Sequence, residues 1–131
     1  MRVLLDTHVL LWILAEPNRL DEETRQAIET GAEEVLFSAA SIWEIAIKSR
    51  LGRTGFTVKP REIARAACDS GFSELPVGSE AAALVAELPL LHRDPFDRLL
   101  VAQAMSEPAI FYTADHRLPA YSELIHRIRS A

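Results

Sequence analysis

Three observations predict that this chain has an α/β fold with a mostly parallel central sheet. Short apolar runs of strand length alternate with longer segments of helical period. The first of these runs, Val3-Leu4-Leu5, is hydrophobic throughout, which is typical of a strand covered by helices on both faces. The 131 residues contain no repeat and no linker. We therefore expect one domain spanning residues 1–131.

The first half of the chain is predicted to run strand, helix, helix, strand, helix. Pro17 ends the first helix, since proline disfavours helix in the residue before it. Gly31 and Gly52 are placed to end the second and third helices. The predicted strands are 3–5 and 34–38, and the predicted helices are 7–15, 21–31 and 38–51.

The second half repeats this alternation with weaker signals. Pro60 and Pro95 each stand in the first turn of a predicted helix, a position where proline is favoured. Residues 117–131 are amphipathic but mixed, so the sequence leaves open whether the chain ends in a strand. The predicted helices are 60–70, 78–88 and 94–106, and the predicted strands are 72–77, which is weak, and 109–113.

The composition is that of an ordinary globular protein, and it argues against a basic nucleic-acid coat protein. The formal net charge is −5, although residues 48–65 hold six basic residues and one acid. A single cysteine, Cys68, allows no internal disulfide, and no apolar segment approaches the length of a membrane span. We expect a cytoplasmic protein that does not bind membranes.

Four carboxylates recur where a strand ends or the next helix begins. In a parallel sheet these junctions share one edge, where ligands usually bind. Each acid could instead cap a helix, and Ser41 with Glu44 matches a capping box if a helix begins at Ser41. The four acids are Asp6, Glu44, Asp97 and Asp115.

A shared pocket of four carboxylates favours a cation, because the charges would otherwise repel one another. Carboxylate oxygens suit Mg²⁺ or Mn²⁺. Such a site fits hydrolysis of a phosphodiester by a metal-activated water, with one or two ions.

Four stretches together resemble the PIN-domain ribonucleases, specifically the VapC toxins of type II toxin-antitoxin systems. They occur in family order and extend over nearly the whole chain. The stretches are Leu4-Leu5-Asp6-Thr7-His8, residues 38–48 around Glu44, residues 92–104 around Asp94-Pro95-Phe96-Asp97, and Thr113-Ala114-Asp115.

The resemblance implies a three-layer α/β/α sandwich, Mg²⁺- or Mn²⁺-dependent endoribonuclease activity, a VapB-type antitoxin and a homodimer. It implies that Asp6, Glu44 and Asp97 are the principal acids and Asp115 a more variable fourth, with Asp94 as the helix cap. Thr7 stands where relatives often have a small hydroxyl residue that helps to hold the first acid or a metal-bound water. Leu11, Trp12 and Leu51 are candidates for partner contact.

Other polar and aromatic residues receive more ordinary interpretations. The histidines match no zinc motif, and we expect them at the surface or behind the acids. Arg98 is expected to be an exposed helix residue, and Trp12 and Trp43 to be buried. Lys48, Arg50 and Arg53 are candidates for contact with RNA phosphates.

Two other classes of function remain open from the residues alone. One is an acid-pocket phosphatase or receiver-like phosphotransfer domain, although His8 stands where the phosphatase would have a second aspartate. The other is a non-catalytic protein-binding module whose acids are only helix caps.

Overall fold

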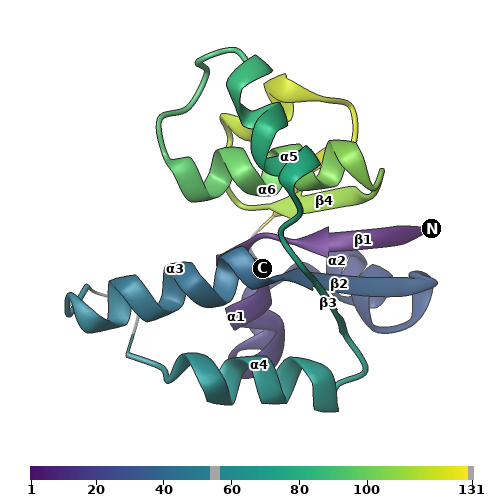
Figure 1. The fold of residues 1–131 in the computed structure, drawn as a ribbon. Helices are drawn as coiled ribbons and strands as arrows, with labels where there is room; N and C mark the ends of the chain where they lie inside the picture. The colour runs from purple at the N-terminus through teal and green to yellow at the C-terminus, as the bar shows by residue number, and fades with distance from the viewer. Residues whose placement is uncertain (54–56, 130–131) are drawn as a thin grey trace.

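A computed structural model describes residues 1–53 and 57–129. Its centre is a parallel five-stranded sheet in the order β3-β2-β1-β4-β5 (Figure 1). The N-terminal strand is central, and Leu4 pairs with Leu36 on one side and with Phe111 on the other. The strands are β1 (Arg2–Leu5), β2 (Glu34–Ser38), β3 (Ser73–Leu75), β4 (Ile110–Thr113) and β5 (Ile125–Arg127).

Helices cover both faces of the sheet, so the α/β class and the three-layer arrangement are confirmed. In Figure 1, α5 and α6 lie above the sheet, whereas α1, α3 and α4 lie below it. The helices are α1 (Thr7–Ala15), α2 (Glu22–Gln26), α3 (Ala39–Arg50), α4 (Pro60–Asp69), α5 (Ser79–Leu84) and α6 (Pro95–Ser106). Four single turns complete the fold: η1 (Pro17–Arg19), η2 (Ala27–Gly31), η3 (Val85–Glu87) and η4 (Leu118–Tyr121).

Two separate apolar cores lie on the two faces, because neighbouring strand residues point to opposite sides. Val3 and Leu5 pack into the core under α1, α3 and α4. Leu4 packs into the other core, which α6 supplies with Leu100 and Ala104. The continuous apolar run at the N-terminus thus contributes side chains to both cores, as expected for a strand that is buried on both faces.

The structure alters several details of the predicted elements. The chain does end in a strand, β5, parallel to β4, and residues 54–56 and 130–131 lie outside the described part. The third helix begins at Ala39 with Ser38 as its cap, so the capping box at Ser41 is wrong. Trp43 is 59% exposed rather than buried, and its ring meets Phe96 edge-on. Within the described residues, no helix is long and apolar enough to cross a membrane.

Arg98 is the largest departure from expectation, because this helix residue is buried rather than exposed. Its guanidinium donates to the carbonyl oxygens of Val85 at 2.9 Å, Leu88 at 3.2 Å and Pro89 at 2.9 Å, and to the Tyr121 hydroxyl at 3.1 Å. No carboxylate of the described residues lies within ion-pair distance of it. The charge is therefore stabilised by carbonyl oxygens of η3 and of the turn that follows it, together with the Tyr121 hydroxyl.

Replacing Arg98 with alanine should destabilise the fold by about 3 kcal/mol, since several buried carbonyl oxygens would lose their donors. Urea unfolding followed by circular dichroism measures the change. Arg98→Lys is the matched control: one ammonium group cannot reach carbonyls on both sides of the turn, so it should recover less than half of the loss. An Arg98→Ala variant within 0.5 kcal/mol of the wild type would contradict this role.

Candidate functional site

The four predicted acids line one pocket at the carboxyl edge of the sheet. The pocket has a volume of about 340 Å³. Asp6 comes directly after β1, Glu44 lies in the second turn of α3, Asp97 in the first turn of α6, and Asp115 two residues after β4. The chain brings them together because parallel strands end at a common edge. The other lining residues are His8, Trp12, Lys48, Asp94, Ala114, His116 and Arg117.

Asp6 is both a helix cap and a member of the pocket. One carboxylate oxygen, Oδ1, accepts the backbone N–H of Thr7 at 2.8 Å at the start of α1. The other, Oδ2, accepts the hydroxyl of Thr113 at 2.5 Å. The side chain is 7% exposed and is held by residues from two neighbouring strand ends. The alternatives of cap and site are therefore not exclusive for Asp6.

Glu44 is the most deeply buried of the four acids, at 3% exposure, and a hydrogen bond and an ion pair stabilise its charge. The Thr7 hydroxyl donates to its Oε1 at 2.6 Å. The Lys48 ammonium, one helical turn later, forms an ion pair with Oε2. Thr7 thus lies beside two of the acids, while Lys48 reaches into the pocket rather than into solvent.

Two of the four acids, Asp6 and Asp97, have a raised pKa. Burial is the main cause that raises the pKa of Asp6 to about 6, with Glu44 and Asp115 adding to it and the bonds from Thr113 and Thr7 opposing it. Burial again comes first for Asp97, whose pKa is raised to about 8, followed by repulsion from Asp6. Such values indicate a site with surplus negative charge, which a cation would relieve.

Asp115 behaves in the opposite way. Burial alone raises its pKa, but hydrogen bonds from Arg117 and His92 outweigh that effect and hold the pKa well below its usual range. The Arg117 guanidinium donates to both carboxylate oxygens, at 3.1 and 3.0 Å. Asp115 therefore stays ionised without help from a metal.

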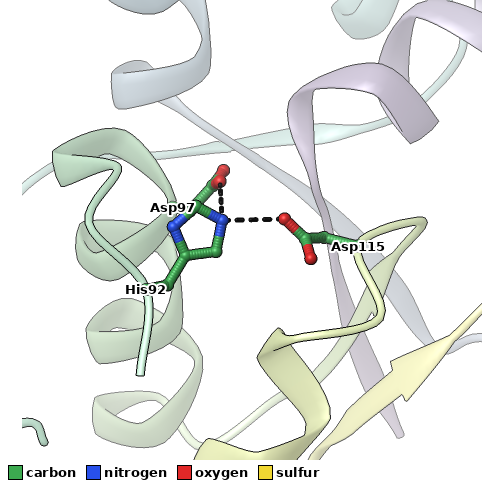
Figure 2. A group of neighbouring side chains, drawn as sticks. All are labelled: His92, Asp97 and Asp115. Atoms are coloured by element: carbon green, nitrogen blue, oxygen red, sulfur yellow. Dashed lines mark hydrogen bonds and ion pairs between the residues drawn. The ribbon is translucent and has the colours of Figure 1, made fainter. Parts of the chain in front are cut away.

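His92 is the residue that the sequence did not single out. It is buried, and its Nε2 lies 2.8 Å from Asp115 Oδ2 and 3.2 Å from Asp97 Oδ2 (Figure 2). The histidines were expected at the surface or behind the acids: His92 lies behind the acids, and His8 and His116 are exposed at the pocket. The sequence contained one indication of this position of His92. The residue stands in the turn that leads into Asp94-Pro95, and such a turn can fold back against the helix that follows it.

The basic residues predicted to contact RNA are divided between two places. Lys48 is in the pocket, whereas Arg50 and Arg53 are exposed at and just beyond the end of α3. Asp94 caps α6 by accepting the N–H groups of Phe96 and Asp97 at 2.8 and 3.3 Å, as expected.

The raised pKa of Asp97 makes the metal-free protein less stable as pH rises. The unfolded chain releases this proton near its ordinary value of 3.8, and the folded chain keeps it to about 8. Between those values the folded state binds more protons, so the free energy of unfolding should fall with increasing pH. Asp6 adds to the slope up to about pH 6. Urea unfolding in EDTA from about pH 4.5 to 8.5 measures this, and Asp97→Asn should flatten the curve. Parallel curves for the two proteins would contradict the prediction.

Comparison with known proteins agrees with this geometry. The profile of the PIN domain family matches residues 3–124. Ribonuclease VapC22 of Mycobacterium tuberculosis is 33% identical over 123 residues, which is 91% of each chain.

Two solved structures share the fold at low identity. One is VapBC2 of Rickettsia felis bound to a DNA fragment from its promoter, with a TM-score of 0.72, 11% identity and coverage of 98% of this chain and 99% of that one. The other is VapBC-5 of Mycobacterium tuberculosis, with a TM-score of 0.63, 20% identity and 98% coverage of both chains. From the match of nearly its whole length to the family profile and from its VapC relative, this chain belongs to the PIN-domain family.

Proposed function

We propose that this chain is a Mg²⁺- or Mn²⁺-dependent endoribonuclease, the toxin of a type II toxin-antitoxin pair. The observation that supports the proposal most is the convergence of Asp6, Glu44, Asp97 and Asp115 on one open pocket. The name of its VapC relative, a ribonuclease, points to the same activity. A helix-capping role alone does not account for four acids from separate elements facing one another.

The donor set fits a hard divalent cation. Every acid offers carboxylate oxygens, the ligands that Mg²⁺ and Mn²⁺ prefer. Asp6 and Asp97 are the first choices for direct ligands, since both have a raised pKa that a nearby cation would lower. Glu44 and Asp115 complete the pocket directly or through water. The bound ion would supply a nucleophile at neutral pH and neutralise charge on the phosphate.

Other side chains of the pocket hold these acids in place. Thr113 and Thr7 fix the rotamers of Asp6 and Glu44 through their hydroxyl groups. Lys48 balances Glu44 inside the pocket, and its ammonium also lies 4.0 Å from Asp94 Oδ2. Arg117 stands at the pocket, anchored on Asp115, where a phosphate entering the site would meet it.

We also propose that a VapB-type antitoxin inhibits the enzyme and that the enzyme forms a homodimer. Toxin and antitoxin would both act in the cytoplasm. The fold neighbours are VapBC structures. Leu51 is 65% exposed, whereas Leu11 and Trp12 are half-buried against the core, so Leu51 is the best placed of the three for partner contact. Light scattering on the purified chain tests the pairing, and the mass of one chain would remove that part of the proposal.

Replacing Asp6 with asparagine should abolish metal-dependent cleavage while keeping the fold, because the amide still fits between Thr7 and Thr113. We expect a loss of about 1000-fold, the equivalent of several kcal/mol of transition-state stabilisation. Cleavage of a labelled RNA with Mn²⁺, and with EDTA in its place, measures it. Asp69→Asn, an exposed acid at the end of α4, is the matched control and should be fully active. Full activity of the Asp6→Asn protein would contradict the central assignment.

The same proteins separate a metal enzyme from a protein-binding module. Mn²⁺ should raise the melting temperature of the wild type and of Asp69→Asn, since a ligand of the folded state stabilises it, but not that of Asp6→Asn. No rise in the wild type would favour the non-catalytic alternative.

Neutralising Lys48, Arg50 and Arg53 to glutamine should weaken RNA binding and reduce its dependence on salt. Each lost phosphate contact removes about 0.7 from the slope of log affinity against log salt for a single strand, so about 2 in total. The measurement is RNA binding in the Asp6→Asn background, where cleavage does not interfere. The control changes the same charge at Lys59, Arg61 and Arg65, which are exposed and do not line the pocket. Equal slopes for the two triple variants would assign the effect to net charge alone.

A further inference from the structure

His92 links two acids that reach the pocket from different parts of the fold. Its Nε2 lies 2.8 Å from Asp115 Oδ2 and 3.2 Å from Asp97 Oδ2, and Figure 2 shows the imidazole between the two carboxylates. Asp97 belongs to α6, whereas Asp115 follows β4. One ring nitrogen therefore sets the spacing between a helix residue and a residue beyond a strand end.

The hydrogen bond at the other ring nitrogen, Nδ1, determines which of the two nitrogens of His92 carries the proton. Nδ1 accepts the backbone N–H of Asp94 at 3.0 Å. A backbone amide can only donate, so Nδ1 presents its lone pair and the proton of the neutral ring is on Nε2. His92 therefore faces the two acids with an N–H group. Carboxylates accept such a bond. The other oxygen of Asp115, Oδ1, accepts from Arg117.

The residues around His92 leave the ring little freedom. The side chain is 7% exposed. The His92 backbone N–H donates to the Tyr121 hydroxyl at 3.0 Å, and that hydroxyl also accepts from Arg98 at 3.1 Å. The backbone of His92 is thus held by η4, and the N–H of Asp94 holds the ring through Nδ1.

We propose that His92 is a positioning residue that holds Asp97 and Asp115 through its Nε2–H, and that it is not itself a ligand of the cation. The inference rests on the proposed metal-dependent function. Hydrogen bonds of this kind to ligating carboxylates orient them and typically contribute 10- to 100-fold in metal affinity. His92 would thus pre-form the part of the pocket that two distant segments supply.

The competing interpretation is that His92 is a third ligand. Its nitrogen and one oxygen from each acid lie within 4.8 Å of one another, as ligand atoms of one ion would. An imidazole ligand would move the preference of the site from Mg²⁺ toward Ni²⁺ or Zn²⁺. Coordination through Nε2 needs the lone pair there and the proton on Nδ1, which already faces the N–H of Asp94. Ligation would therefore require the turn before α6 to open.

Two substitutions separate the two hydrogen bonds of the ring, the donor at Nε2 that faces the acids and the acceptor at Nδ1 that faces Asp94. In His92→Gln the amide NH₂ lies as many bonds from Cβ as Nε2 does, so it can still donate to the acids. In His92→Asn the side-chain oxygen takes the place of Nδ1 and keeps the bond from Asp94, but the donor to the acids is lost. If His92 positions the acids, Gln should bind Mn²⁺ within about 3-fold of the wild type and Asn about 10- to 100-fold more weakly.

The readout is Mn²⁺ binding to the RNA-free protein, followed by electron paramagnetic resonance of the free ion. Thermal melting in EDTA checks that both variants fold. Unchanged affinity in His92→Asn, or an equal loss in the two variants, would overturn the proposal. A wild type that binds no Mn²⁺ would instead remove the proposed function, so the two failures are distinguishable.

Parallel titrations with Ni²⁺ test ligation. A positioning role predicts that His92→Asn loses affinity for Mn²⁺ and Ni²⁺ by a similar factor, whereas a much larger loss for Ni²⁺ would make His92 a ligand. The wild type provides a test without any substitution. The ¹⁵N shifts of the His92 ring should report a protonated Nε2 both in EDTA and with saturating Mg²⁺, and loss of that proton on adding Mg²⁺ would overturn the assignment.

Discussion

Electrostatic repulsion among the carboxylates at one sheet edge is the constraint on which the site depends. Parallel strands place Asp6 and Asp115 close together, and the helices that follow add Glu44 and Asp97. Without compensation these charges would push the strand ends and helix starts apart. The structure compensates by assigning donors to them: Thr113 to Asp6, Thr7 and Lys48 to Glu44, and Arg117 to Asp115.

This compensation is uneven, and the unevenness gives the pocket its chemical character. Glu44 and Asp115 have cationic partners inside the protein. Among the described residues, the Asp6 side chain accepts from the backbone N–H of Thr7 and the hydroxyl of Thr113, and the Asp97 side chain contacts the His92 imidazole. These are the two acids whose pKa is raised. The fold thus leaves an excess of negative charge on one side of the pocket, between the end of β1 and the start of α6.

The sequence predicted the parts that follow from periodicity and from junctions. Asp6 and Asp115 follow strands, and Asp97 lies behind an Asp-Pro cap, so parallel topology alone brings them together. What it could not predict depends on contacts between distant segments. Arg98 shows a helical spacing that fits solvent exposure, but the carbonyls that receive it belong to a turn whose path no local pattern specifies. Likewise, Trp43 meets Phe96 of α6 edge-on and remains exposed, a contact between two helices that the composition of α3 does not reveal.

The bond between Thr113 and Asp6 joins positions 107 residues apart. During synthesis the first acid therefore exists long before the residue that fixes its rotamer, and β1 lacks one of its two neighbouring strands until β4 has been made. A ribosome-bound intermediate that ends before residue 113 has neither this hydroxyl nor Asp115. The order of translation thus delays completion of the pocket until residues 113–115 have been made, and a shorter growing chain has no finished centre to act from.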